Sequence, residues 1–387
     1  MIRLILLTDF TEAFAQYLLK GILRYSKGRE PWVVCRMPPS YKQRYGIEGV
    51  LNWAKKWEAD AIIAQFDIDD EVNLFVENGI VAVAQDYKSR FTTIPNITSD
   101  YHLAGRMAAD FFIQKGYKNF AFFGYKDVVW SEERCEGFLN RIVESSYAGS
   151  FYEYHNEKIE DLWFYESAPL IKWLKGLPKS TALMACDDNQ AIKITEACRM
   201  VGLKIPEEIA VLGVDNDTVI CNLSDPPLSS LHMNIEMGGY DAAALIDGML
   251  KNEGASYTDI YIKPLNIVNR ISTDIYSTDD PYVLNAIKYI HQNLSIKLSV
   301  EDVVRQVPLS RRLLEMRFKD VTGESIYQYM LKTRIEYFAQ LLLSSSEPIS
   351  DIAVNIGFVD YKNLARQFRI LKNCSPSEYR LRNKKKK

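Results

Sequence analysis

Four carboxylates stand where apolar runs of the sequence end, a position from which a side chain can reach a ligand. They are Asp9, Asp67, Asp187 and Asp215. Ionised carboxylates accept hydrogen bonds, the guanidinium fork of Arg134 donates them, and an aromatic ring offers an apolar face. A ligand rich in hydroxyls needs all three, and the aromatic candidates are Phe10, Phe66 and Trp130. These eight residues together predict a sugar-binding site.

Each of these residues also has a plainer interpretation. An Asp that follows a strand is often a helix cap, and Asp188 is the best candidate for that role. Phe10 and Phe66 fit a hydrophobic core as well as they fit a sugar ring. Trp130 fits an exposed loop or a contact with a partner.

Acid/base catalysis on a glycoside is the enzymatic alternative, with the neighbours Asp187 and Asp188 as the two carboxylates. Adjacent residues at a strand end point in different directions, which argues against such a pair. The sequence shows no nucleophile, metal-ligand set or phosphate loop. We therefore expect a binding protein without metal or cofactor, and not an enzyme.

Two segments of the C-terminal part repeat one another. Ser310 can cap a helix whose apolar stripe is Leu314, Phe318 and Val321, and the counterparts fifty residues later are Asp360, Leu364, Phe368 and Leu371. Shorter helices are expected ahead of them, at 301–306 and 350–355. The exposed faces carry side chains that can reach base edges in DNA, namely Arg311, Arg312, Glu315, Met316, Tyr361, Lys362 and Arg366. For the basic residues, phosphate contact is the alternative role.

The charge distribution indicates nucleic-acid binding in the same region. From Tyr282 to Lys387 there are 19 Lys or Arg and 10 Asp or Glu, a net charge of +9, whereas the whole chain carries −3. The first 281 residues therefore carry −12. This asymmetry predicts that the C-terminal part meets the phosphates. A solvated helical bundle is the alternative, and the repeat argues against it.

The four carboxylates must be positioned by strands that alternate with helices. In the first part, strands are expected at 4–7, 32–36, 61–64 and 81–84, and helices at 13–26, 49–57 and 71–78. In the second part, we expect a helix at 101–115, a strand at 119–123, a loop at 125–133 that leads through Arg134 into a helix, strands at 183–185 and 210–214, and a helix at 190–201. The alternation predicts two doubly wound α/β lobes with a cleft between them. The chain is expected to cross between lobes through 223–228 and then pack helix 238–250 on the first lobe.

The chain has 387 residues, of which 47% are hydrophobic and 25% charged, enough for two or three domains. No stretch is typical of a membrane span, and the first apolar run is interrupted by Asp9 too early for a signal peptide. Six cysteines and four histidines are scattered without the spacing of disulfides or metal sites. We expect a cytoplasmic protein that has no membrane partner.

The C-terminal repeat resembles the AraC/XylS family of bacterial transcription regulators. The matching segments follow in the family's order and are Leu331–Arg334, Ala339–Leu343, Ile352–Ala353, Ile356–Phe358 and Cys374–Arg380. The resemblance implies that each recognition helix enters a successive major groove, with a long helix at about 326–343 between the two units. Two departures are Pro308 and Asn373, which stand where the family usually has Gly.

Residues 1 to about 275 resemble the effector domain of the LacI/GalR repressors and the sugar-binding periplasmic proteins. The segments that carry this resemblance are Ala185–Ala191, Gly202–Ile209 and Val211–Asp217. It implies that Asp187, Asp215 and Arg134 contact sugar hydroxyls. It also implies that helices 101–115 and 238–250 form a dimer face.

The two parts together resemble the xylose operon regulators, through 62–67, 119–124, 213–216 and 228–230. The resemblance implies a two-lobed α/β sensor domain of the periplasmic-binding-protein type (type I) at 1–276, a linker at 277–281, and an all-α DNA-binding domain with two helix-turn-helix motifs at 282–387. It further implies a homodimer that binds a monosaccharide, D-xylose or another pentose, and a double-stranded DNA operator, and that activates through RNA polymerase. A carbohydrate-active enzyme fused to a DNA-binding domain is the alternative.

Overall fold

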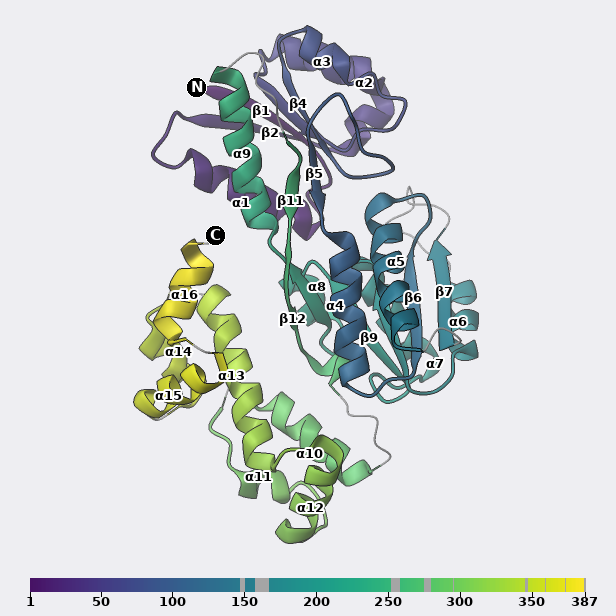
Figure 1. Cartoon of the computed structure of the whole chain (residues 1–387), viewed down its shortest axis with the longest axis vertical. Coiled ribbons are helices and arrows are strands. Elements are labelled where there is room, and N and C mark those ends of the chain that lie inside the picture. Colours follow the sequence, from purple (N-terminus) through teal and green to yellow (C-terminus); the bar gives the residue numbers. More distant parts are fainter. Residues whose placement is uncertain are drawn as a thin grey trace. The chain divides into compact units, whose positions relative to one another are not determined.

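The computed structural model describes residues 1–146, 150–156, 167–251, 258–274, 280–294, 296–344, 347–358, 360–372 and 374–385. Its contacts divide the chain into two compact units, Met1–Ile267 and Val268–Lys387 (Figure 1). The sequence placed the end of the sensor at 276, and part of the predicted linker, 277–279, lies outside the described residues. Among the described helices, none combines the length and the apolar character that a bilayer crossing requires.

The first lobe of unit Met1–Ile267 is a six-stranded sheet in the order β11-β5-β4-β3-β1-β2. Its elements are β1 (Ile2–Leu7), α1 (Ala13–Ser26), β2 (Trp32–Met37), α2 (Pro39–Lys56), β3 (Ala61–Ala64), α3 (Asn73–Glu77), β4 (Val81–Gln85), β5 (Asn96–Ser99), α9 (Ile235–Lys251) and β11 (Ile260–Ile262). Side chains of a strand alternate between its faces, so Leu4 and Leu6 pack with α1 and α9, whereas Ile5 and Leu7 pack with α2 and α3. The predicted alternation of strands and helices is confirmed.

The second lobe is a six-stranded sheet in the order β12-β10-β9-β8-β6-β7. Its elements are α4 (Tyr101–Gln114), β6 (Asn119–Tyr125), α5 (Val129–Glu144), β7 (Phe151–Asn156), α6 (Ser167–Gly176), β8 (Thr181–Ala185), α7 (Asp188–Val201), β9 (Ile209–Val214), α8 (Thr218–Leu223), β10 (Ser229–Met233) and β12 (Pro264–Val268). The expected loop at 125–133 is wrong in its second half, because α5 already begins at Val129. Trp130 and Arg134 therefore lie on a helix.

Helices α4 and α5 pack at backbone distance through two glycines. A Cβ on Gly105 would overlap the carbonyl oxygen of Arg134, and a Cβ on Gly137 would overlap that of His102. Because both positions lack a side chain, α5 lies flat on α4. This contact holds the helix that carries Trp130 and Arg134.

The chain crosses between the lobes at three neighbouring places: between β5 and α4, between β10 and α9, and between β11 and β12. Backbone hydrogen bonds join these crossings, from Asp100 N to Ile262 O at 3.2 Å and from Asn234 N to Lys263 O at 3.0 Å. The predicted crossing through 223–228 is wrong, because that segment leads from α8 to β10 inside the second lobe. Its prolines do mark a turn, but the strand that follows the turn, β10, still belongs to the second sheet, and the chain crosses to the first lobe only after it. Helix α9 packs on the first lobe, as expected.

Unit Val268–Lys387 is helical beyond the end of β12. Its elements are the 3-10 helix η2 (Ile271–Thr273) and the helices α10 (Pro281–Gln292), α11 (Val300–Val304), α12 (Arg311–Thr322), α13 (Ile326–Ser344), α14 (Ile349–Asn355), α15 (Tyr361–Lys372) and α16 (Pro376–Lys385). It has two separate cores, and α13 contributes Ile326 and Met330 to the first and Ile335 and Phe338 to the second. The predicted pair of helix-turn-helix units on one long helix is confirmed.

The two repeats are alike in their caps but differ in their apolar stripes. Ser310 Oγ accepts from Leu313 N at 3.4 Å, and Asp360 Oδ1 accepts from Lys362 N at 2.9 Å, so both predicted caps form. Leu364 and Phe368 are buried, but Leu371 is 41% exposed and its predicted place in the core is wrong. The last position is filled differently here, because Tyr379 of α16 packs edge-on against Phe368 at 5.4 Å.

Replacing Phe368 by Ala should destabilise the C-terminal unit by about 3 to 5 kcal/mol, since it empties the centre of the second core. Leu371→Ala is the matched control and should cost less than about 1 kcal/mol, because that residue is 41% exposed and lies outside the core. All six tryptophans lie between residues 32 and 173, so their fluorescence reports only the sensor. Urea unfolding of the full chain, followed by helical circular dichroism and by tryptophan fluorescence, separates the two units. Equal losses in both variants would contradict the assignment of the core.

Candidate functional sites

A cleft of about 720 Å³ lies in the first unit, where the strand ends of the two lobes face each other. Six of the eight predicted ligand residues line it, and they are Asp9, Asp67, Trp130, Arg134, Asp187 and Asp215. The cleft has the size of ordinary small-molecule sites in proteins, about 300 to 1,000 Å³. Because both lobes contribute side chains, a bound ligand would touch both at once.

Phe66 and Phe10 are not among the residues that line the cleft. Phe66 is fully buried and packs at 5.9 Å from both Phe75 and Phe91. It continues the alternation of Ile62 and Ala64 toward the core beneath α2 and α3, a signal already present in the sequence. Phe10 packs against the main core, with the guanidinium of Arg36 5.8 Å from its ring centroid. Phe66 is therefore a core residue, whereas Phe10 is half-buried and packs against the core.

Arg134 is the fixed cation of the cleft. Its guanidinium is buried and donates to the carbonyl of Cys186 and, at 3.4 Å, to Asp215 Oδ1. It also lies over the rings of Tyr101 and Trp130, at 5.2 and 5.4 Å from their centroids. These contacts come from α4, α5 and the ends of β8 and β9, so four elements hold one side chain in place.

Two neighbouring carboxylates at the start of α7 have different tasks. Asp187 is the helix cap, because its Oδ1 accepts from Gln190 N at 2.7 Å. Asp188 is buried on the first turn and accepts from Asp217 N at 2.7 Å. The expectation that Asp188 is the cap is therefore wrong, since α7 begins at Asp188 itself, two residues before the start expected at 190. Burial raises the pKa of both carboxyls.

Glu12 was missed by sequence reasoning and lies among the cleft's carboxylates. Burial, followed by the nearby Asp187, Asp9 and Asp215, raises the pKa of its carboxyl from 4.5 to about 8. At neutral pH it is therefore mostly protonated and can donate a hydrogen bond, which an ionised carboxylate cannot. Its position three residues after Asp9, at the start of α1, is the only local signal.

Two basic residues, Lys42 and Arg90, form ion pairs beside the cleft. Lys42 of α2 lies 2.8 Å from Asp67 Oδ2, so Asp67 does not face a ligand as a free charge. Arg90 binds Glu133 of α5 through two hydrogen bonds, at 2.6 and 2.8 Å, and thereby connects the two lobes. Arg90 also donates to Asp86 at 3.0 Å, although burial outweighs this and raises the pKa of Asp86 to about 6.

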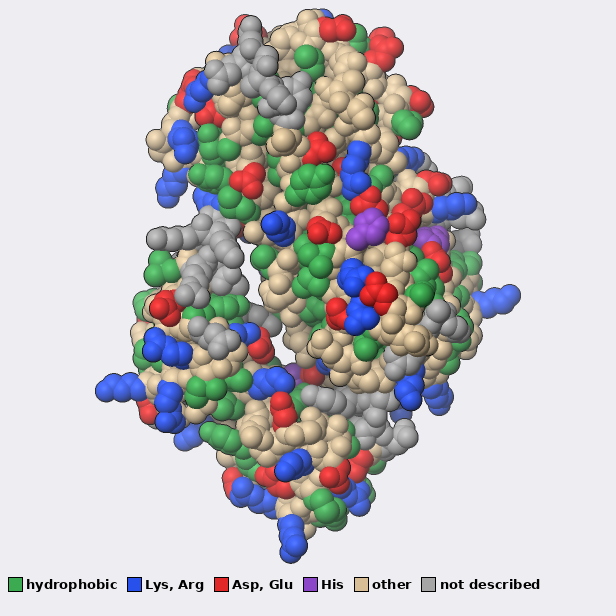
Figure 2. All heavy atoms as spheres, in the orientation of Figure 1, with side chains coloured by type: hydrophobic (Ala, Val, Ile, Leu, Met, Phe, Trp, Pro, Cys, Tyr) green, Lys and Arg blue, Asp and Glu red, His purple; other side chains and the backbone are tan. Residues whose placement is uncertain are grey.

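The outer faces of α12 and α15 form the candidate nucleic-acid interface, and Figure 2 shows Lys and Arg side chains on the surface of both. The exposed members of the predicted set are Arg311, Arg312, Met316, Tyr361, Lys362 and Arg366. Glu315 is only half-exposed, and its Oε2 accepts from Ile326 N at 3.4 Å, which occupies it at the start of α13. Arg311 pairs with Glu301 of α11.

Comparison with known proteins identifies both units. Residues 109–273 match the model of a periplasmic binding protein-like domain, and residues 303–382 match that of a helix-turn-helix domain. The xylose operon regulatory protein of Haemophilus influenzae is 32% identical over 329 residues, which cover 83% of this chain and 85% of that protein. The protein of the same name from Escherichia coli K12 is 28% identical, over 98% of this chain and 96% of its own.

Two solved structures are similar to this chain in fold. A structure of the xylose-binding transcription activator XylR superposes with a TM-score of 0.62 at 26% identity and covers 98% of this chain and 97% of its own. A periplasmic binding protein/LacI transcriptional regulator from Alkaliphilus metalliredigens, solved with D-xylulofuranose, has a TM-score of 0.57 at 20% identity, over 71% of this chain and 99% of its own. The second likeness concerns the fold alone.

Glu12→Gln should make the sensor more stable at alkaline pH. A raised carboxyl pKa means that the folded state keeps a proton that the unfolded state releases, so Glu12 lowers the unfolding free energy as pH rises from 4.5 to about 8. Gln removes this dependence. The melting temperature of the variant, followed by tryptophan fluorescence, should exceed that of the parent by an amount that grows across this range. Glu48→Gln, at an exposed position of α2, is the control, and parallel curves for all three proteins would contradict the burial of Glu12.

Proposed function

Because the chain belongs to the family of xylose operon regulatory proteins, we propose that its cleft binds D-xylose or another pentose and thereby controls a sugar-utilisation operon. The chain is a DNA-binding transcription regulator with a sugar-sensing domain. It is not an enzyme, since the relatives that match over most of its length are regulators. The pentose and the operon are our proposal.

The observation that carries this proposal is the set of polar groups that meet in the cleft. Asp9, Asp187 and Asp215 supply acceptors, and Arg134 and the protonated Glu12 supply donors. A monosaccharide presents hydroxyls that donate and accept, so it pairs with both kinds of group. The ring of Trp130 lines the same cleft and supplies an apolar surface.

Sugar binding acts on the chain through the angle between the lobes. A ligand shifts a conformational equilibrium only by its differential affinity for the two states. A sugar that contacts Asp9 on one lobe and Asp215 on the other binds best when the lobes are closed. The three adjacent crossings permit rotation, and the contact between Arg90 and Glu133 spans the lobes where they approach.

The connection from the sensor to the DNA-binding unit is short. Strand β12 ends at Val268, and Asp274 is already buried in the second unit, where it accepts from Tyr329 Oη of α13 at 3.1 Å and pairs with His291 of α10. Only a few residues lie between these points, so we expect lobe rotation to move the helix-turn-helix pair. In a homodimer this changes the spacing of two DNA-binding units on an operator.

We expect α12 and α15 to enter successive major grooves of the double-stranded DNA operator. The exposed side chains of each helix lie opposite its buried stripe, as groove reading requires. A regulator bound in this way acts in the cytoplasm, where the DNA is, and we propose that it activates by recruiting RNA polymerase. The homodimer and the polymerase contact rest on the family resemblance.

Asp215→Ala and Arg134→Ala should each weaken binding of D-xylose by about 1 to 3 kcal/mol, because each leaves a buried polar partner unpaired. Titration calorimetry with D-xylose, other pentoses and hexoses gives the affinities and the preferred sugar. Asp225→Ala is the control, since that exposed carboxylate pairs with Arg199 outside the cleft. DNA binding without sugar should persist in all three variants. An unchanged sugar affinity in Asp215→Ala and Arg134→Ala would show that the sugar binds elsewhere.

Arg312→Ala and Arg366→Ala should relax base preference at two different sets of base pairs, about one helical turn apart. Each bidentate contact to a base contributes about 1 to 3 kcal/mol of discrimination. Selection of binding sites from a random DNA library measures this preference for each variant. Arg305→Ala, an exposed residue after α11, is the control. Uniform weakening with unchanged base preference would assign both arginines to phosphate contact.

A further inference from the structure

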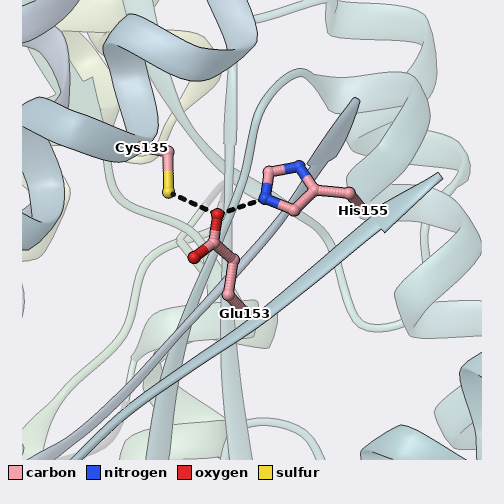
Figure 3. A group of neighbouring side chains, drawn as sticks. All are labelled: Cys135, Glu153 and His155. Carbon is pink, nitrogen blue, oxygen red and sulfur yellow. Dashed lines mark hydrogen bonds and ion pairs between the residues drawn. The ribbon is translucent and has the colours of Figure 1, made fainter. Parts of the chain in front are cut away.

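A second group of reactive side chains lies in the second lobe, where Cys135 of α5 faces Glu153 and His155 of β7 (Figure 3). Cys135 Sγ lies 3.4 Å from Glu153 Oε1, and His155 Nε2 contacts the same carboxylate oxygen. The three potential ligand atoms lie within 4.8 Å of one another. None of these residues lines the cleft.

The alternation of β7 brings this group together. Tyr154 points to the opposite face of the sheet, where it stacks on Phe123 at 5.6 Å. Glu153 and His155, two residues apart, therefore share the face that α5 covers. Since β7 is the edge strand of its sheet, one side of the group remains open to solvent, and the Glu153 side chain is 41% exposed.

The surroundings do not favour three polar groups without a further partner. Aromatic rings border them, with Phe122 6.2 Å from the His155 ring. His155 Nδ1 is buried and has no hydrogen-bond partner among the described residues. The thiol and the imidazole converge on one carboxylate oxygen, so a cation between the three groups could bind all of them.

We propose that Cys135, Glu153 and His155 bind a divalent transition-metal ion of the zinc type. Zinc takes thiolate sulfur, imidazole nitrogen and carboxylate oxygen, and three such ligands leave a fourth tetrahedral position for water. Calcium and magnesium take oxygen ligands and do not fit this set. The Cys135 thiol releases its proton to solvent as its sulfur binds the metal.

Such an ion joins β7 to the helix that carries Trp130 and Arg134. Cys135 directly follows Arg134, so a bond from its sulfur to the metal restrains the turn of α5 that presents the guanidinium. Metal binding to the folded state alone raises the stability of the sensor in proportion to the logarithm of metal concentration. This effect needs no sugar, and its outcome is independent of the proposed pentose.

The test uses Co²⁺, whose bond to a thiolate gives a charge-transfer band in the near ultraviolet, with the full-length protein. One equivalent should produce the band, and Zn²⁺ should abolish it by displacement. Cys135→Ser should lose the band, whereas Cys35→Ser, which alters a half-buried thiol of β2, should keep it. Glu153→Gln and His155→Gln should each weaken Zn²⁺ binding at least about tenfold, since even outer-shell substitutions cost that much.

Several results would overturn the proposal. They are a folded parent protein that gives no thiolate band, a band that persists in Cys135→Ser, and Zn²⁺ affinities of Glu153→Gln and His155→Gln equal to that of the parent. If Cys135→Ser does not fold, the Glu153 variant decides alone, because that side chain is 41% exposed and the Gln amide keeps the shape of the carboxylate.

Discussion

The buried guanidinium of Arg134 is the charge on which the cleft depends. A buried cation is stable only when hydrogen-bond acceptors and counter-charges surround it. The carbonyl of Cys186, the carboxylate of Asp215 and two aromatic faces meet that requirement. The ends of β8 and β9 must therefore lie next to α5, and the glycine contact at Gly105 keeps α5 close enough to α4 for this. The same arrangement leaves Asp215 with a pKa raised to about 6, because burial outweighs Arg134.

The balance of charge in the cleft is negative, although Lys42 and Lys88 line it beside Arg134. The carboxylates around it outnumber the cations, so an additional negative charge at Glu12 would be repelled by Asp187, Asp9 and Asp215. The protein meets this constraint by holding a proton, and it thereby obtains a donor in a site that otherwise consists mainly of acceptors. A neutral ligand with hydroxyls can satisfy both kinds of group, whereas an anion would meet the excess of carboxylates. The electrostatics therefore favour a sugar over a sugar acid or a phosphorylated sugar.

The DNA-binding unit is subject to a different constraint, because the exposed faces of α12 and α15 must be held at a fixed distance from each other. Each helix-turn-helix unit has its own core, and α13 runs through both. Since side chains of one rigid helix fill both cores, the separation of α12 and α15 is set by α13. The burial of Asp274 against Tyr329 places the entry of the chain on this same helix. A displacement that reaches Asp274 thus acts on the element that spaces the two reading faces.

Local periodicity was enough to predict the elements and the repeat from the sequence. The alternation of strands and helices, the caps Ser310 and Asp360 and the fifty-residue repeat were predicted correctly, except for the place of Leu371 in the second stripe. Six of the eight expected ligand residues line the cleft. The four Asp residues do so because parallel strands bring their carboxyl ends to one edge, whereas Trp130 and Arg134 come from helix α5. The remaining features depend on contacts between distant segments of the chain. The raised pKa of Glu12 and the hydrogen bonds of Arg90 to Glu133 both involve residues far along the chain. Glu153 and His155 contact Cys135 only because β7 lies beside α5. Tyr379 packs against Phe368 in the second core, whereas Leu371 stays exposed. The periodicity of apolar residues indicates which face of a helix or strand is buried. Which element packs on that face depends on how distant segments of the chain come together.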